Sequence, residues 1–346
     1  MSSKTPGRRV RSFLKYLYVS VLYRSGLLAL ARSRVRRRSQ VAVLTLHRVL
    51  PDEEFARTSS LPGMIMRAKT FTALCEHLRS HYEVVLAERL GRISEQSLRP
   101  RVSVTFDDGW ADTATVAAPI AEAHGVPFLV FVCPGLMGRR FPFWPERAAY
   151  AFSAEARRSR SEVRTFVENL KSMAPGDREG ALRSFRPVPI EEMENAEPLN
   201  ASFPREEMPR LIARGGSVGS HTCNHRILTQ VTAEDARWEL QESRDRLERE
   251  LQRPCDTFAY PNGNHSDVIR TAVANVGYRL AFTTVLGLWS DATDPLLIPR
   301  INITESHVTN PLGKFSPAMF EYYVFWRARR ATAKQTTTDH SGGRDS

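Results

Sequence analysis

Residues 104–109 read Val-Thr-Phe-Asp-Asp-Gly, one of the two most informative stretches of the chain. The alternating apolar residues Val102, Val104 and Phe106 are typical of a buried strand. The strand ends in two adjacent carboxylates and a glycine. We therefore expect it to deliver Asp107 and Asp108 to the edge of a sheet.

A second stretch, residues 220–225, reads Ser-His-Thr-Cys-Asn-His and places two histidines four positions apart. If one turn of helix forms there, both imidazoles face the same way. Two imidazoles and one carboxylate make a facial site with open positions, which is typical of a catalytic zinc rather than a closed structural one. The remaining carboxylate is then free to act as a general base.

Each stretch alone also has an ordinary interpretation. Asp-Asp-Gly is common in turns, and histidines four apart often form a surface pair. Here both stretches follow a short apolar run and both adjoin a glycine. Their combination indicates a site, and a metal that only stabilises the fold is the lesser alternative.

The two stretches resemble the first and second motifs of the polysaccharide deacetylases, carbohydrate esterase family 4. The resemblance covers roughly residues 41–310. It implies that Asp107 is the catalytic base and that Asp108, His221 and His225 bind a divalent metal such as Zn²⁺. It also implies an α/β fold, a distorted (β/α) barrel of about seven parallel strands.

A third stretch, residues 258–263, resembles the Tyr-Pro-x-Gly variant of the family's third motif. This implies an oxyanion and substrate role for Tyr260, Pro261 and Asn262, with the backbone N–H of Asn262 helping to hold the oxyanion. The arginine that usually precedes this proline is missing, since no arginine lies between residues 257 and 264. We predict that Arg300 fixes Asp107 instead.

The general acid is the least defined part of the predicted site, because the family's late Leu-x-His motif is not evident near residue 301. The candidates are His47, His265 and His307. We favour His47, because it ends the apolar run 41–46 and a strand would bring it to the edge that carries Asp107. Some relatives that act on poly-N-acetylglucosamine resemble this chain in that histidine. The alternative is a histidine that only caps its strand.

The resemblance implies a metal-dependent hydrolase that removes N-acetyl groups from an amino-sugar polysaccharide or its lipid-linked precursor, as in exopolysaccharide or cell-envelope biosynthesis. An O-deacetylase or deformylase on the same scaffold is an alternative that no residue separates. A carbohydrate-binding pseudoenzyme is another. The intact Asp107, Asp108, His221 and His225 argue against that last possibility.

Charge is distributed unevenly along the chain. Residues 1–40 hold 11 of the 49 Lys and Arg and no acidic residue, so the remaining 38 basic residues equal the 38 acidic ones. The neutral body gives no indication of nucleic-acid binding. The four cysteines are widely scattered, which predicts reduced core residues rather than a disulfide framework.

The basic segment 1–40 is apolar-rich over residues 13–31, but Lys15 and Arg24 interrupt it and an arginine run follows. An interior arginine costs about 2.5–3.5 kcal/mol on membrane insertion. We predict an interfacial helix on an anionic membrane surface, which makes the protein cytoplasmic and peripheral at the inner membrane face. An export signal and a plain docking helix are the alternatives.

The catalytic domain is predicted to span residues 41–330, with a helical insertion at about 144–205 and a disordered tail at 331–346. The insertion either lines the substrate groove or only caps an edge. The alternation of strands and helices implies parallel pairing with helical crossovers. Strands are expected at residues 42–46, 82–86, 101–106, 128–132, 257–260, 279–283 and 296–303, and helices at 68–81, 110–124 and 233–251.

Overall fold

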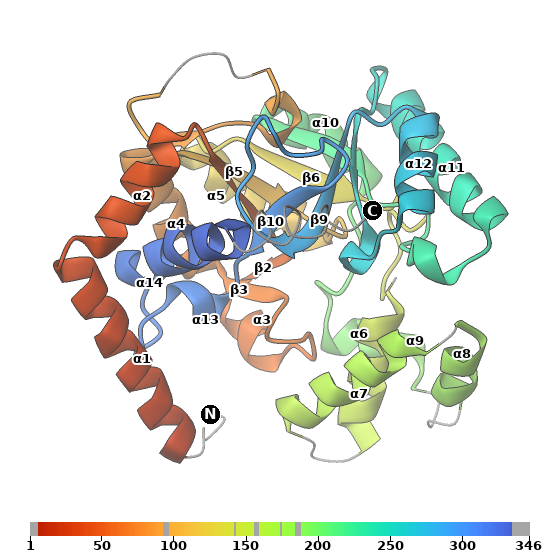
Figure 1. The fold of residues 1–346 in the computed structure, drawn as a ribbon. Helices are drawn as coiled ribbons and strands as arrows, with labels where there is room; N and C mark the ends of the chain where they lie inside the picture. The colour runs from red at the N-terminus through yellow and green to blue at the C-terminus, as the bar shows by residue number, and fades with distance from the viewer. Residues whose placement is uncertain are drawn as a thin grey trace, which may run out of the picture.

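The centre of the molecule is a closed barrel of parallel strands (Figure 1). The structure, a computed structural model, describes residues 6–92, 97–141, 143–155, 159–173, 175–183 and 188–333. Seven strands follow one another in the order β1-β10-β9-β8-β7-β6-β5, and β5 pairs back with β1. The predicted barrel class is therefore confirmed. The seven strands are β1 (Val41–Leu46), β5 (Arg101–Phe106), β6 (Phe128–Val132), β7 (Gly216–Ser220), β8 (Thr257–Ala259), β9 (Leu280–Leu286) and β10 (Ile298–Asn302).

The barrel is distorted where β5 and β6 meet, because only the carboxyl end of β5 pairs with β6, Thr105 with Leu129 and Phe106 with Val130. The first half of β5 pairs with the short strand β4 (Glu83–Val84) instead. A longer strand was predicted there, at residues 82–86. The observed strand is shorter, and a 3-10 turn, η1 (Ala87–Arg89), follows the predicted range. A separate pair, β2 (Arg48–Leu50) and β3 (Ile65–Arg67), lies beyond the end of β1.

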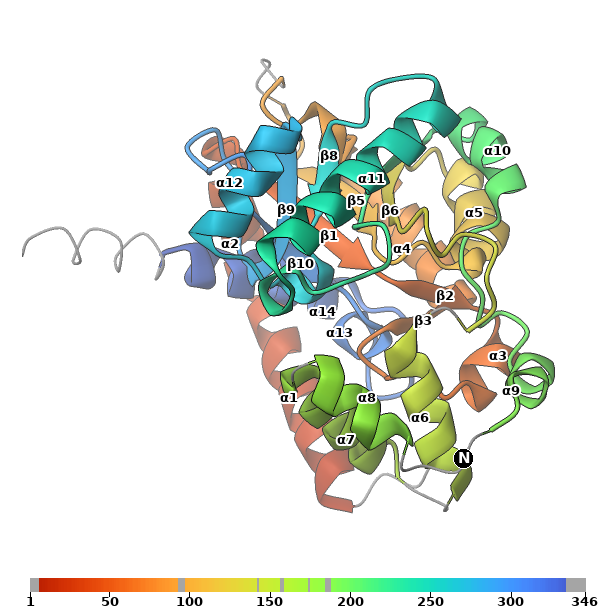
Figure 2. The same cartoon turned by 90° about the vertical axis from the view of Figure 1, so that its right-hand side faces the viewer.

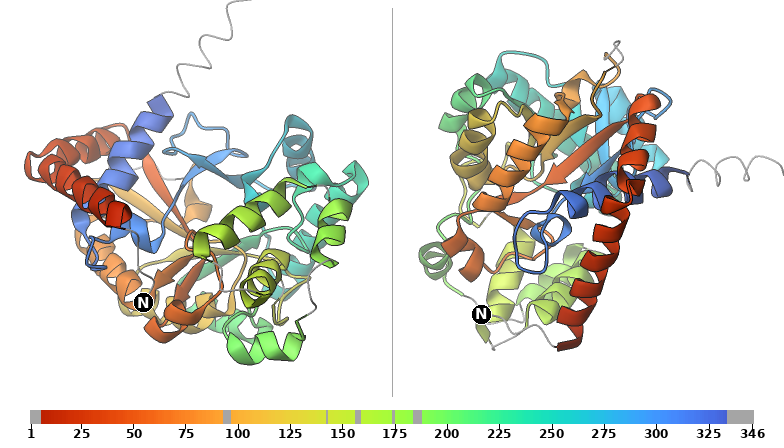
Figure 3. Two further views of the ribbon diagram at one scale, coloured as in Figure 1. Left: turned by 90° about the horizontal axis from the view of Figure 1, so that it is seen from below. Right: turned by 90° about the vertical axis from the view of Figure 1, so that its left-hand side faces the viewer.

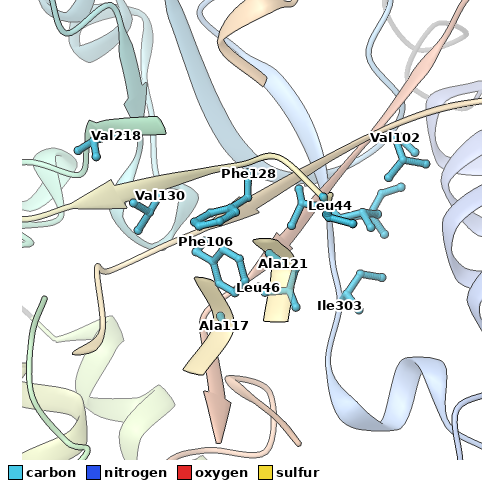
Figure 4. Packing of buried hydrophobic residues seen from close by; sticks show 14 of the residues in the cluster. Leu44, Leu46, Val102, Phe106, Ala117, Ala121, Phe128, Val130, Val218 and Ile303 are labelled. Carbon is cyan, nitrogen blue, oxygen red and sulfur yellow. The ribbon is translucent and has the colours of Figure 1, made fainter. Parts of the chain in front are cut away.

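Alternation along the strands builds two cores, one outside and one inside the barrel. Leu44, Phe106 and Val130 pack in the outer core with residues of the surrounding helices (Figure 4). The inner core includes Leu129 and Phe131. Apolar residues on both faces explain why these strands are continuous apolar runs in the sequence.

The predicted helices at residues 68–81 and 233–251 are confirmed as α4 (Ala68–His81) and α11 (Ala233–Leu251). The helix predicted at 110–124 is confirmed: it runs from residue 111 through a π-helical turn, η2 (Thr113–Ala117), into α5 (Ala118–Ala123). The other helices around the barrel are α3 (Asp52–Arg57), η3 (Arg205–Glu207), α10 (Met208–Ala213), η4 (Leu228–Gln230), η5 (Pro261–Gly263), α12 (Asp267–Val276) and α13 (Glu305–Val308).

The predicted insertion forms a group of helices beside the barrel (Figure 2). Leu61, from the loop after α3, packs in a small core with Ala149, Val163 and Val167. Another contact joins the Arg48 guanidinium to the Leu199 carbonyl at 2.7 Å. The insertion is therefore fixed to segments that follow the carboxyl end of β1. Its helices are α6 (Trp144–Glu155), α7 (Arg160–Ser172), α8 (Pro175–Arg183) and α9 (Ile190–Ala196).

The two ends of the described chain pack side by side (Figure 3). The basic segment forms α1 (Pro6–Arg24) and α2 (Leu27–Arg37), which contact α14 (Pro317–Glu321) and η6 (Tyr322–Arg327). Residues 328–333 stay helical, so the predicted disorder does not begin at 331; residues 334–346 lie outside the described range.

Helix α2 belongs to the folded body rather than to a separate N-terminal segment. Its residues Ala31 and Val35 join the main core, and Arg32 forms an ion pair with the buried Glu321. Across the described residues, no helix combines the length and the apolar character that a membrane span needs.

Candidate metal centre and catalytic site

The predicted site residues lie where strands end. His47 directly follows β1, Asp107 and Asp108 follow β5, and His221 follows β7. Because all seven strands are parallel, their carboxyl ends meet at one rim of the barrel. This rim is where barrel enzymes of the (β/α) type carry their active sites.

Asp108, His221 and His225 form a cluster with the geometry of a metal centre. The Oδ1 atom of Asp108 lies 3.4 Å from His221 Nε2 and 3.1 Å from His225 Nε2. One donor atom from each residue falls within 4.8 Å of the other two. One carboxylate oxygen and two imidazole nitrogens are donors that suit Zn²⁺ and leave positions open. The residues present therefore fit a divalent ion.

Two further contacts orient these donors. His221 Nδ1 lies 2.7 Å from the Ala259 carbonyl, so Nδ1 is the donor of that bond and the ring is oriented with Nε2 facing Asp108. The indole N–H of Trp110 donates to Asp108 Oδ2 at 2.9 Å, which leaves Oδ1 for the histidines. Burial favours the neutral carboxyl, but bonds from His221 and His225 outweigh it and hold the pKa of Asp108 well below its ordinary value.

The histidines do not converge through a helical turn, so that expectation was wrong. Residues 221–227 have no helical assignment, and Thr222 and His225 have φ values of 63° and 57°. The loop is shaped by distant partners, since the backbone N–H of Asn224 donates to buried Glu239 at 2.8 Å. Such left-handed residues cost on the order of 1–3 kcal/mol each and cluster at functional sites.

Gly109 is needed next to the acidic pair because it combines φ of 67° with close packing. A Cβ atom there would lie 2.8 Å from Val132 Cγ1. Asp108 itself has φ of 71°. The strand thus turns sharply after Asp107, which sends the two adjacent carboxylates to different partners.

Asp107 is clamped by Arg300, as the missing third-motif arginine led us to predict. Arg300 Nη1 donates to Oδ1 at 2.7 Å and Nη2 to Oδ2 at 2.6 Å, a bidentate pair with both side chains buried. Arg300 Nε in turn donates to the Thr283 carbonyl at 2.8 Å. Burial raises the pKa of Asp107, but the charge of Arg300 outweighs it, so this pKa is lowered from its ordinary value.

His47 lies close enough to Asp107 and Asp108 for their charges to affect its pKa. Burial nevertheless lowers the pKa of His47 from 6.5, against the opposing effect of both carboxylates. Its Nδ1 is buried and has no hydrogen-bond partner among the described residues. An unsatisfied ring nitrogen beside two carboxylates is available to a bound molecule.

The other two histidine candidates have partners of their own. His307 stacks on Tyr323 with ring centres 4.3 Å apart, and it is half-buried rather than solvated. Its Nδ1 lies 3.0 Å from the Asn302 carbonyl. His265 Nδ1 lies 3.0 Å from the Gly263 carbonyl, and its ring packs near Tyr260. No contact to Asp107 or Asp108 is found for either among the described residues.

The third motif places its side chains away from the acidic pair. Tyr260 is fully buried in the outer core, where its hydroxyl donates to the Leu296 carbonyl at 3.0 Å and its backbone N–H donates to Phe282. Pro261 is buried too, whereas Asn262 is exposed and has φ of 57°. The structure therefore does not direct the Tyr260 side chain toward a substrate, and within this motif the backbone at Asn262 is the group left to hold an oxyanion.

Sequence reasoning missed a buried network behind the metal cluster. The Arg48 guanidinium lies 4.3 Å from the Trp110 ring centre, and its Nε donates to Asp112 Oδ2 at 2.9 Å. The Phe143 ring packs edge-on against His225 at 5.1 Å. The available signals were the positions of Trp110 and Asp112, two and four residues after Asp108. Their partners come from distant segments and leave no local pattern.

The four cysteines are unpaired and buried, as predicted. Cys133 Sγ donates to the His221 carbonyl at 3.1 Å, so it supports the histidine loop. Burial raises the pKa of Cys133 well above its ordinary value and keeps it a thiol. Cys223 lies between the two histidines but is absent from the donor cluster.

Comparison with known proteins identifies the family. A family model described as polysaccharide deacetylase matches residues 95–281, more than half of the chain. The chain belongs to the polysaccharide deacetylase family. A putative polysaccharide deacetylase of Bacillus subtilis, YxkH, is 22% identical over 114 residues, or 33% of this chain and 41% of that protein. The match therefore spans less than half of the length of this relative.

Solved structures support the fold. The Streptococcus pyogenes deacetylase PplD, determined in complex with acetate, superposes with a TM-score of 0.54 at 22% identity, covering 80% of this chain and 99% of that one. The Bacillus cereus polysaccharide deacetylase BC0361 gives a TM-score of 0.54 at 18% identity, covering 79% of this chain and 67% of that one. At these identities the similarity establishes the fold alone.

Proposed function

We propose that this protein removes N-acetyl groups from an amino-sugar polysaccharide or its lipid-linked precursor, using a divalent metal ion. The observation that carries the proposal is that two adjacent carboxylates have different partners. Asp108 meets His221 and His225, while Asp107 is held apart from them by Arg300. A metal ligand and a base side by side are what metal-assisted hydrolysis of an amide by water uses.

In this mechanism Asp108, His221 and His225 would hold the ion, and Zn²⁺ suits their donor set best. When bound, such an ion polarises a carbonyl and makes a water more acidic. Asp107 takes the proton of the attacking water on its carboxylate, which Arg300 orients. The backbone N–H of Asn262 donates to the oxygen that becomes negative. His47 protonates the departing amine.

Release of acetate from a panel of N-acetylated glycans tests the proposal, with the Asp107→Asn variant as the background control. Formate release and release from O-acetylated glycans are measured on the same samples, because an ester or formyl group could be cleaved by the same residues. If acetate is released from O-acetylated but not from N-acetylated glycans, the protein is an O-deacetylase and the proposed activity is wrong. Glycan binding without release of any acyl group would indicate a pseudoenzyme.

The role of His47 predicts an unusually acidic pH profile. Because burial lowers its pKa below 6.5, the protonated ring is lost at lower pH than for an ordinary histidine. The basic limb of the kcat/KM profile should therefore fall below pH 6.5 and disappear in His47→Ala. Profiles of the wild type, His47→Ala and His265→Ala check this. A limb that survives in His47→Ala and disappears in His265→Ala would assign the acid to His265.

We also propose that α1 attaches the protein to an anionic membrane surface, on the cytoplasmic leaflet. One face of α1 packs on the body through Val19 and Leu22. The other carries an exposed stripe at helical spacing, which consists of Val10, Phe13, Leu14, Leu17 and Val21. Exposed basic residues such as Arg11 and Arg24 accompany the stripe, and residues 1–40 contain no acid. An apolar stripe with basic flanks is typical of interfacial helices.

Replacing Phe13 and Leu17 together with serine should abolish sedimentation with anionic vesicles. The body should stay folded, because both side chains are more than half exposed. Binding of the wild type should weaken as salt rises, since cationic groups supply part of it. The matched control is Trp238→Ser, an exposed aromatic on α11. Attachment that is insensitive to salt would point to a spanning or exported form instead.

A further inference from the structure

A pocket of about 400 Å³ lies outside the metal centre, where the helical insertion meets the loop after α3. Tyr150 and Ser153 of α6 and Val163 of α7 line one side, and residues 56–62, the end of α3 and the loop after it, line the other. Its volume is in the range of small-molecule sites. We propose that this pocket binds a second sugar ring of the same glycan, a ring distant from the one being deacetylated. This inference rests on the proposed function.

The lining of the pocket has the two-sided character of a pyranose ring, which presents an apolar C–H face and polar edges. Leu61, Val163 and the Tyr150 ring supply apolar surface. The Tyr150 ring is supported edge-on by Phe141, with ring centres 5.7 Å apart. An aromatic side chain of this kind offers rigid apolar surface together with a polar hydroxyl.

A buried carboxylate supplies the polar side. Glu197 is 5% exposed, and it accepts hydrogen bonds from the Thr58 hydroxyl at 3.0 Å and from the Ser59 backbone N–H at 2.7 Å. The Asn200 amide is a third donor, at 3.3 Å. A carboxylate has about four acceptor positions, so room for one more donor remains. A sugar hydroxyl is such a donor.

The charges of the pocket disfavour a phosphorylated ligand. Arg57 is the one cation among the described lining residues, and it already forms an ion pair with Glu54. The other charged lining residue is Glu197. Phosphate sites in proteins gather arginines, lysines or helix N-termini instead. A neutral ligand with several hydroxyl groups therefore fits best.

A chain of contacts joins the pocket to the metal centre. Ser60, which lines the pocket, accepts from Arg48 Nη1 at 2.7 Å and donates to Glu146 at 2.8 Å. Arg48 packs on the ring of Trp110, whose N–H donates to Asp108. The pocket is thus separated from a metal ligand by the side chains of Arg48 and Trp110.

The test compares N-acetylglucosamine with longer chitin oligomers and their differently linked isomers. The advantage of the longer substrate in kcat/KM over the single sugar should fall about tenfold in Tyr150→Ala, the size expected for losing one aromatic contact. Ser153→Trp, which fills the pocket from the same helix, should have the same effect. Trp238→Ala removes an exposed aromatic elsewhere and is the matched control. Thermal melting verifies that each variant is folded.

Binding provides a second readout that needs no turnover. In an Asp107→Asn background, calorimetry should show that Tyr150→Ala weakens binding of the long oligomer more than binding of the single sugar. If the ratio of kcat/KM for the long oligomer to kcat/KM for the single sugar is unchanged in both pocket variants, the pocket is not a sugar site. Absence of deacetylation by the wild type on every glycan would instead overturn the proposed function, so the two failures are distinguishable.

Discussion

Replacing His221 with alanine should yield a folded protein that no longer retains the divalent ion. The substitution removes one of three protein donors and leaves Asp108 with His225 alone. Loss of an outer partner of a ligand typically costs roughly 10–100-fold in metal affinity, and loss of a ligand should cost more. Elemental analysis of protein purified without chelator measures the ion content, and deacetylation should disappear with the ion.

The matched control for this experiment is His265→Ala, because His265, like His221, has its Nδ1 beside one backbone carbonyl. It should keep the ion. Equal metal content in wild type and His221→Ala would contradict the assignment of the centre. Since His221 is also joined to Cys133 through its carbonyl, a melting curve shows whether the loop has been preserved.

Asp107→Asn should keep the ion and lose activity by roughly 10²–10⁴-fold, the usual contribution of a general base. The amide has the shape of the carboxylate but cannot accept a proton from water. It also leaves the Arg300 charge uncompensated inside the barrel, and breaking a buried pair costs about 3–5 kcal/mol of stability. Turnover is therefore measured well below the melting temperature of the variant. Activity within a few-fold of wild type would exclude Asp107 as the base.

Most of the barrel could be predicted because its strands are short apolar runs that carry their own signal. β6 has the predicted bounds, and β5 ends at Phe106 as expected. Once β5 is placed, the parallel alternation of strands and helices leads Asp108 and His221 to one rim. The placement of Arg300 was predictable for a different reason, since a buried carboxylate such as Asp107 needs a cation when the usual one is missing.

The remaining parts of the site depend on contacts between distant segments. The spacing of His221 and His225 indicated a helix, yet the loop conformation follows from Glu239 and from residues that pack around it. Trp110 orients Asp108 only because Arg48 supports its ring from another part of the chain. The local pattern of apolar and polar residues predicts neither of these two contacts. The same holds for α2, whose arginines indicated a surface helix while Ala31 and Val35 join the core.

The closure of the barrel by β1 and β10 also shapes how the chain must fold during synthesis. The first strand finds one neighbour early, because β5 pairs with it along its whole length. Its other neighbour is the last strand, β10, which is synthesised much later. The helices α1 and α2 likewise pack against α14 and η6, which are synthesised last. At ribosomal rates of about 5–20 residues per second, that wait lasts tens of seconds. A nascent chain therefore holds an open strand edge until its last strand emerges, and chaperone demand should concentrate in this interval.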